Sequence, residues 1–220
     1  MTTALVTGAN RGIGLELVRL FASRGTDVIA VCRSVSTELS ELPVEVVEGI
    51  EVTSDVAVRT LVEVVGKRPL DVIVLNAGIL EADSLGSVDL DSVRRQFEVN
   101  SLAPLRVTNA LLGNLRHGSK VVIITSRMGS IADNTSGGSY GYRMSKAAVN
   151  AFGKSLAIDL GDRGVAVAIL HPGWVRTDMT GHTGNVDAAE SATQLLERIE
   201  TLTLQSSGEF HHMNGEELPW

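Results

Sequence analysis

The chain has 220 residues with a formal net charge of −7, and hydrophobic residues make up 44% of it. This length is enough to bury a sizeable core, and the acidic balance argues against nucleic acid or an anionic membrane as the main partner. The only cysteine is Cys32, so no internal disulfide can form and a reducing, cytoplasmic location is expected. The N-terminal residues show no charged leader before a long apolar stretch, so we expect neither a signal peptide nor a membrane span.

Short β-branched runs alternate with segments of helical periodicity along the chain. Strands are predicted at residues 3–7, 27–32, 44–49, 70–78, 120–126, 165–171 and 209–212. Helices are predicted at residues 14–25, 54–65, 91–114, 142–160 and 187–203, with a bend in the third near Pro104. The strands are continuously apolar, which is typical of burial on both faces. This order predicts a single α/β domain over residues 1–220, with a doubly wound parallel sheet of about seven strands and helices on both faces.

The stretch LVTGANRGIGLEL joins the first predicted strand to the first helix and carries Gly8, Gly12 and Gly14. Glycines there let the backbone turn sharply, and the N-terminus of the next helix offers free N–H groups to a phosphate. The spacing is G-x-x-x-G-x-G, not the G-x-G-x-x-G of the general dinucleotide fingerprint. A purely structural turn is the alternative, but the position at the first strand–helix turn favours a nucleotide cofactor.

The residues after the second predicted strand indicate which cofactor binds. An acidic side chain there would bind the ribose 2′-hydroxyl of NAD. The stretch AVCRSVS instead places Arg33 just past the strand, with no Asp or Glu, and Arg11 lies inside the glycine-rich loop. Two guanidinium groups suit a 2′-phosphate, so NADP(H) is predicted in preference to NAD(H). The alternative is that both arginines are solvated surface charges.

Tyr142 and Lys146 lie four residues apart at the start of the amphipathic helix predicted for residues 142–160, so they share one helical face. A free tyrosine has a pKa of ~10, and a nearby cation lowers that value by stabilising the phenolate. The two side chains are therefore a candidate acid–base pair. An ordinary surface pair is the alternative.

Six stretches occur in the order and at the structural positions of one known family. They are TGANRGIG, NAG at residues 76–78, FEVNSLAPL, IITS ending at Ser126, YRMSK and HPGWVRTDM. On these motifs the chain resembles the short-chain dehydrogenases/reductases over nearly its whole length, and it looks most like carbonyl-reductase-type and C-factor-like members. The resemblance implies a Rossmann-type fold and hydride transfer between a nicotinamide cofactor and a carbonyl compound or alcohol.

The resemblance also implies roles for individual residues. Tyr142 would be the general acid in reduction and the base in oxidation, and Lys146 would bind the nicotinamide ribose and lower the tyrosine pKa. Ser126 would position the substrate carbonyl, and Asn100 would hold a water in the proton relay. The implied cofactor site consists of Gly8, Asn10, Arg11, Gly12, Ile13, Gly14, Arg33, Glu51, Val52, Asn76, Ala77, Gly78, Tyr142, Lys146, Pro172, Gly173, Val175 and Thr177.

Ser126 lies sixteen residues before Tyr142, a longer spacing than in many members of the family, so Ser130 is a competing candidate. The segment 180–190, which should cover the pocket, is short, polar and glycine-bearing, which predicts a permissive pocket for small or medium carbonyl compounds. Its apolar walls, unless they belong to the core, are expected to come from Ile131, Met144, Trp174 and Met179.

The leading hypothesis is an NADP(H)-dependent carbonyl reductase or alcohol dehydrogenase acting on a small molecule. One alternative is a low-turnover NADP(H)-binding regulatory or signalling protein on the same scaffold, since a fold does not guarantee activity. A second alternative is an epimerase or dehydratase, although those usually carry longer C-terminal regions. By resemblance we expect a homodimer or homotetramer. The five histidines show no metal-ligand spacing, so no metal is expected.

Overall fold

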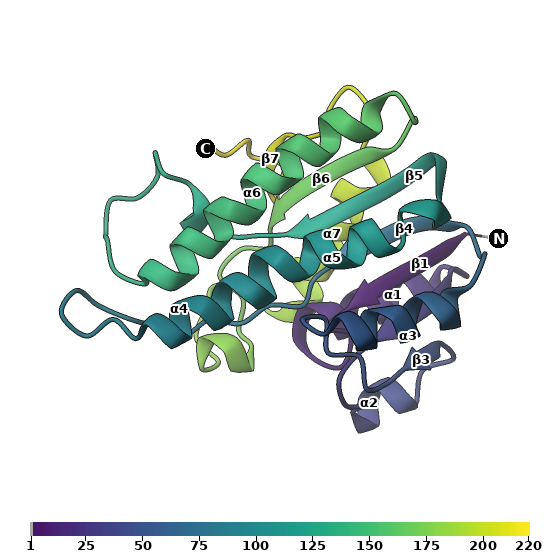
Figure 1. The fold of residues 1–220 in the computed structure, drawn as a ribbon, viewed down its shortest axis with the longest axis horizontal. Coiled ribbons are helices and arrows are strands. Elements are labelled where there is room, and N and C mark those ends of the chain that lie inside the picture. Colours follow the sequence, from purple (N-terminus) through teal and green to yellow (C-terminus); the bar gives the residue numbers. More distant parts are fainter. Residues whose placement is uncertain (1) are drawn as a thin grey trace.

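The computed structural model describes residues 2–220, and its centre is one parallel sheet (Figure 1). The sheet has the strand order β3-β2-β1-β4-β5-β6-β7. Order reverses between β1 and β4, and ligands of open α/β sheets bind beyond the carboxyl ends of strands at such a point. The strands are β1 (Thr3–Thr7), β2 (Asp27–Val31), β3 (Glu45–Val47), β4 (Leu70–Leu75), β5 (Leu115–Ile124), β6 (Ala166–His171) and β7 (Phe210–His212).

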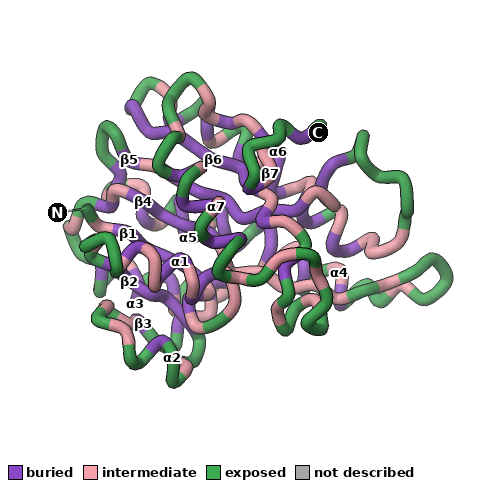
Figure 2. Tube along the Cα trace, turned by 180° about the vertical axis from the view of Figure 1, so that it is seen from behind, coloured by how far each residue is buried: buried purple, intermediate pink, exposed green. Residues whose placement is uncertain are grey.

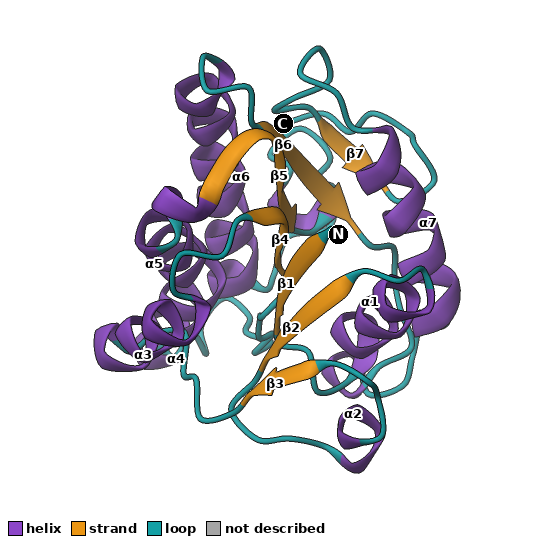
Figure 3. Cartoon of the chain, turned by 90° about the vertical axis from the view of Figure 1, so that its right-hand side faces the viewer, coloured by secondary structure: helices purple, strands orange, loops and turns teal. Residues whose placement is uncertain are grey.

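Helices cover both faces of this sheet, as Figure 3 shows in edge view. One face is covered by α1 (Gly12–Ser23), α2 (Thr37–Ser40) and α7 (Ala188–Thr201). The other is covered by α3 (Asp55–Val65), α4 (Leu90–Phe97), α5 (Ala103–Ala110) and α6 (Tyr140–Gly161). The architecture is the doubly wound, Rossmann-type fold that the sequence predicts. Within residues 2–220, no helix is long and apolar enough to cross a membrane.

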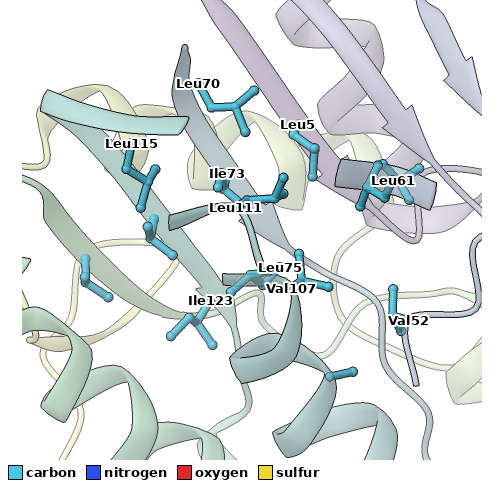
Figure 4. Close-up of a cluster of buried hydrophobic side chains, with 14 of the residues drawn as sticks. Leu5, Val52, Leu61, Leu70, Ile73, Leu75, Val107, Leu111, Leu115 and Ile123 are labelled. Atoms are coloured by element: carbon cyan, nitrogen blue, oxygen red, sulfur yellow. The ribbon is translucent and has the colours of Figure 1, made fainter. Parts of the chain in front are cut away.

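The core consists of two layers of side chains, one on each face of the sheet. Successive residues of a strand point to opposite faces, so Leu5 packs toward α3 and α5 while Ala4 and Val6 pack toward α1 and α7. Figure 4 shows the first layer, where Ile73 and Ile123 of neighbouring strands meet side chains of the covering helices. The strands are the most continuously buried parts of the chain (Figure 2). Burial on both faces explains their unbroken apolar sequences.

Several predicted boundaries are wrong, and two of the differences form the site. β4 ends at Leu75 rather than at residue 78, and β5 ends at Ile124 rather than at residue 126. The residues just beyond each end leave the sheet and become available for binding. β5 also begins at Leu115, whereas the sequence predicts its start at residue 120. The single turn α2 was missed because it is too short to show periodicity, although Ser36 caps it through the N–H of Leu39 at 3.2 Å.

The helix predicted at residues 91–114 is interrupted, close to the expected bend. A π-helical turn (Glu98–Leu102) separates α4 from α5, and Pro104 follows it in the first turn of α5. Proline has no N–H to donate and its ring clashes with the carbonyl four residues earlier, so a regular α-helix cannot run through it. Single π-turns of this kind are frequent at functional sites, and this one contains Asn100.

Candidate functional site

The polar side chains predicted for catalysis meet beyond the carboxyl end of β5. Ser126 lies two residues after the end of that strand, and α6 carries Tyr142 and Lys146 across it. The Lys146 ammonium donates to the carbonyl of Ile124, the last residue of β5, at 3.1 Å. The helix can lie this close because Gly129 has no side chain: a Cβ there would be 2.7 Å from the backbone of Lys146.

Ser126 and Tyr142 are neighbours, and the Ser126 side chain is close enough to influence the pKa of the phenol. Burial raises the pKa of Tyr142 to about 12, and the Ser126 side chain acts in the opposite direction. Ser126 is itself oriented, because its hydroxyl accepts a hydrogen bond from the N–H of Met128 at 3.1 Å. The competing candidate, Ser130, accepts from the N–H of Asp133 instead. A 3-10 turn (Arg127–Gly129) and the loop after it accommodate the long spacing.

Lys146 does not lower the pKa of Tyr142 in this structure as the sequence comparison implies. Its ammonium lies 5.7 Å from the centre of the Tyr142 ring, yet burial of the phenol outweighs this attraction. Burial also lowers the pKa of Lys146 to about 8. The phenol of Tyr142 therefore stays protonated at neutral pH, while the Lys146 ammonium titrates at a pH just above neutral.

Asn100 uses its side-chain amide for structure. Its Nδ2 donates to the carbonyl of Ile79 at 2.9 Å and to Ser145 Oγ at 3.0 Å, and its Oδ1 accepts from the N–H of Ile79 at 2.8 Å. Both Nδ2 hydrogens are therefore used, and the backbone carbonyl of Asn100 is a candidate acceptor for a water, because Pro104, four residues on, has no N–H to donate to it. Ser145 and Ile79 are site-supporting residues that sequence reasoning missed. The Asn100-x-x-x-Pro104 spacing was an available signal.

The glycine-rich turn lies at the carboxyl end of β1, beside the residues that follow β4. Gly8 adopts φ 66°, a conformation that favours glycine. Asn76 fastens the turn, donating from Nδ2 to the carbonyls of Thr7 at 3.0 Å and Gly8 at 3.1 Å. A Cβ on Gly8 would lie 2.9 Å from the Cα of Ala77. Asn76 and Ala77 therefore shape the turn, and Gly78 lies beside Asn100 and Lys146.

The residues of this turn fit a dinucleotide phosphate. Helix α1 starts after Arg11, which makes no side-chain cap, and its first turn contains no acidic residue. Its first N–H groups and positive dipole end are thus free for an anion. Gly14 allows the close approach of turn and helix, because a Cβ there would be 2.2 Å from the carbonyl oxygen of Gly8. Asn10 and Ile13 lie in the same turn, each partly exposed.

Gly14→Ala should destabilise the protein by about 3 kcal/mol, because the added methyl overlaps the Gly8 carbonyl and the Asn76 amide. Urea unfolding followed by circular dichroism measures this. Gly161→Ala is the matched control, since Gly161 is also helical and a Cβ there has nothing within 4 Å. Equal stability of the two variants would contradict the close approach of turn and helix.

Both arginines predicted for the 2′-phosphate are paired with carboxylates. Arg33, after β2, lies 3.4 Å from Glu51, and Arg11 lies 2.9 Å from Asp178. All four side chains are substantially exposed, so these are solvent-screened pairs that an incoming phosphate can replace. Val52, next to Glu51, is buried.

The segment after β6 lies over the glycine-rich turn. A Cβ on Gly12 would be 3.3 Å from Thr177, and the Arg11–Asp178 pair joins the same two segments. Gly173 has φ 86°, and Val175 is buried and paired with Val186. Pro172 is anchored through its carbonyl, which accepts from Ser191 Oγ at 2.7 Å. The side chains suggested as pocket walls are all exposed rather than core: Ile131, Met144, Trp174 and Met179.

His171, the last residue of β6, was not singled out by the sequence. Burial and the neighbouring His212 lower its pKa to about 3, so its ring is neutral. Its Nδ1 has no hydrogen-bond partner, and its ring lies edge-on to that of His212 at 5.0 Å. Among residues 2–220, no three His, Cys, Asp or Glu side chains are grouped to hold a metal. A hollow of about 240 Å³, lined by residues that include Arg198 and His211, contains none of the site residues.

Comparison with known proteins places this arrangement in a family. The family model described as short chain dehydrogenase matches residues 2–187. A relative from Rhodococcus, 1-hydroxy-2-glutathionyl-2-methyl-3-butene dehydrogenase, is 42% identical over the full length of both chains. C-signal from Myxococcus xanthus is 46% identical over 155 residues, covering 69% of this chain and 93% of the relative. The NADPH-bound carbonyl reductase from chicken fatty liver superposes with a TM-score of 0.89 at 29% identity, covering 100% of this chain and 99% of that one.

The chain belongs to the short-chain dehydrogenase/reductase family. It is similar to carbonyl reductases in structure and to a dehydrogenase in sequence. These findings place it among the oxidoreductases of that family.

Proposed function

We propose that the protein is an NADP(H)-dependent carbonyl reductase that also runs in reverse as an alcohol dehydrogenase. The observation that carries this proposal is the buried Ser126–Tyr142 pair beside Lys146, at the edge of the sheet that also bears the glycine-rich turn. Ligands of doubly wound sheets bind at this edge. The NADPH bound to the similar carbonyl reductase from chicken supports the cofactor assignment.

The residues divide the chemistry between binding and proton transfer. NADPH, when bound, supplies the hydride. The N-terminus of α1 would hold its pyrophosphate, and Arg11 and Arg33 its 2′-phosphate. Ser126 and Tyr142 are neighbouring side chains, so both hydroxyls would hydrogen-bond one carbonyl oxygen. Because the pKa of Tyr142 is about 12, its phenol carries a proton at neutral pH and can donate it to that oxygen as alkoxide charge develops.

Lys146 and Asn100 would restore the proton to Tyr142. The pKa of Lys146, about 8, lets its ammonium release and regain a proton near neutral pH. The Asn100 carbonyl, in the π-helical turn just before Pro104, would accept a hydrogen bond from a water next to it. A Cβ on Gly78 would lie 3.3 Å from Asn100 Oδ1 and 3.7 Å from Lys146 Nζ, so the two residues adjoin the same point.

The cofactor preference is tested at Arg33. Arg33→Ala should weaken NADPH binding about tenfold by removing one charge-assisted contact to the 2′-phosphate, while NADH binding stays the same. Glu51→Gln should do the opposite and strengthen NADPH binding by about threefold, because it releases Arg33 from its carboxylate partner. Nicotinamide fluorescence measures both dissociation constants. Equal losses for NADPH and NADH in Arg33→Ala would contradict the assignment.

Substrate turnover separates this proposal from its rivals. The purified protein is mixed with NADPH and a panel of ketones and aldehydes, and absorbance at the nicotinamide band is followed; the reverse panel includes an alcohol bearing a glutathionyl group, as in the name of the Rhodococcus relative. Carbonyl reduction supports the reductase. Tight NADPH binding with no turnover supports the regulatory alternative, for which the likeness to C-signal is the specific observation. Turnover that leaves the nicotinamide band unchanged supports an epimerase or dehydratase.

Self-association and location are further parts of the proposal. Leu102, Leu105 and Ile158 expose 43%, 48% and 70% of their surface on the helical layer containing α5 and α6, which supports a homodimer or homotetramer formed through these helices. Light scattering distinguishes these states from a monomer. Cys32 is buried and unpaired, in keeping with the reducing cytoplasm proposed for the protein.

A further inference from the structure

Helix α6, which carries Tyr142 and Lys146, begins without a capping side chain of its own. Ser139, at the N-cap, is in the left-handed region at φ 49° and makes no side-chain bond to the helix. The first N–H groups of a helix need outside acceptors. Here the N–H groups of Tyr140 and Gly141 donate to the two carboxylate oxygens of Asp83, at 2.6 and 3.0 Å. The N–H of Ser139 donates to the Asp83 carbonyl at 2.9 Å.

Asp83 reaches this position because the segment before it is fixed at every second residue. The Asn100 amide pairs with both the N–H and the carbonyl of Ile79. The Gln96 amide does the same with Glu81, at 3.2 and 3.0 Å. Asn100 and Gln96 are four residues apart on one helical face. The extended segment is thus held along that face, and Asp83 comes next in the same alternation.

The contact joins two parts of the molecule that are distant in sequence. In Figure 1 the loop before α4 and the start of α6 lie at the same end of the molecule. The same loop begins at Gly78, beside Asn100 and Lys146. One short segment therefore runs from the proposed cofactor site to the first turn of the helix that carries the proposed acid.

We propose that Asp83 is a positioning residue for Tyr142. Tyr142 follows directly after the two residues whose N–H groups Asp83 accepts, so the carboxylate fixes the turn from which the phenol projects. A helix terminus without acceptors frays, and a misplacement of about 1 Å at a reacting group costs about 10²-fold in rate. This inference rests on the proposed function, because it assigns Asp83 to the same acid.

The test compares Asp83→Ala and Asp83→Asn with Ser54→Ala, which removes the cap of the remote helix α3 at the N–H of Ala57. Asp83→Ala should lower kcat for ketone reduction by about tenfold or more, with the NADPH dissociation constant within about twofold. Asp83→Asn, which keeps one acceptor oxygen, should be intermediate. Ser54→Ala should lower thermal stability but leave kcat within about twofold.

Hydrogen–deuterium exchange tests the inference without relying on activity. The backbone amides of residues 138–146 should exchange at least about tenfold faster in Asp83→Ala than in the wild type. In Ser54→Ala their exchange rate should equal that of the wild type. If the wild type reduces no carbonyl compound, the proposed function fails while exchange still tests the cap. Unchanged exchange in Asp83→Ala overturns the inference. The inference is also overturned if Ser54→Ala, at the same loss of stability, lowers kcat as much as Asp83→Ala does. It is overturned as well if Asp83→Ala loses NADPH affinity in proportion to its loss of kcat.

Discussion

Replacing Tyr142 with Phe is expected to lower kcat for carbonyl reduction by about 10³-fold. The substitution removes one oxygen and with it the phenol hydroxyl that is the proposed proton donor beside Ser126. The NADPH dissociation constant should stay within about twofold, because the ring and its packing remain. Steady-state kinetics and nicotinamide fluorescence measure the two effects separately.

Tyr140→Phe is the matched control for that variant. Tyr140 lies in the same first turn of α6, but its structural contact is its backbone N–H, which phenylalanine keeps. Its kcat should stay within about twofold of the wild type. If both variants retain full activity, Tyr142 is not the acid and the reductase proposal must find another proton donor.

Lys146→Met is expected to abolish most turnover and yet make the protein more stable at pH 7. Burial lowers the pKa of Lys146 from 10.5 to about 8, and no carboxylate offsets that effect. At ~1.36 kcal/mol per pKa unit, holding the ammonium there costs roughly 3 kcal/mol. Leaving the Ile124 carbonyl without its donor offsets part of the gain. A net increase of about 1–2 kcal/mol, or roughly 4 °C in Tm, is expected.

The stability advantage of Lys146→Met over the wild type should depend on pH. Since the folded pKa lies below the unfolded one, the native state disfavours the charged lysine: the penalty is full below about pH 8 and disappears as pH approaches 10.5. The advantage of Lys146→Met should therefore shrink across that window, as measured by urea unfolding at several pH values. Lys154→Met, on the same helix but at an exposed position, is the control and should show no such trend. A variant less stable than the wild type at pH 7 would contradict the cost assigned to this lysine.

Much of the fold was predictable because its signals are local. β1 begins and ends where the apolar run Thr3–Thr7 does, and the seven predicted strands all occur. Their unbroken apolar character follows from burial on both faces, which requires a parallel sheet under two helical layers. The glycine-rich turn and the Tyr142–Lys146 spacing were likewise readable, because each lies within one strand–turn–helix unit or one helical turn.

The tertiary structure decided what depends on residues far apart in the chain. Asn100 contacts Ile79 and Ser145 through bonds that neither periodicity nor motif spacing indicates. The pKa of Tyr142 is another such property: the sequence placed a cation one turn away and suggested a lowered value, but complete burial raises it. Burial is a property of the packed molecule, and a spacing rule cannot measure it.

The features readable from the sequence differ physically from those that only the tertiary structure decides. The sequence by itself determined the class of fold, because short-range sterics and hydrophobic periodicity encode it, and its motifs indicated a candidate cofactor turn and a candidate acid. Only the tertiary structure decided that Arg33 shares its charge with Glu51 and that Asp83 caps the helix bearing Tyr142. Both contacts join segments that are far apart in the chain and are brought together only by sheet order and helix packing, so no local pattern in the sequence indicates them.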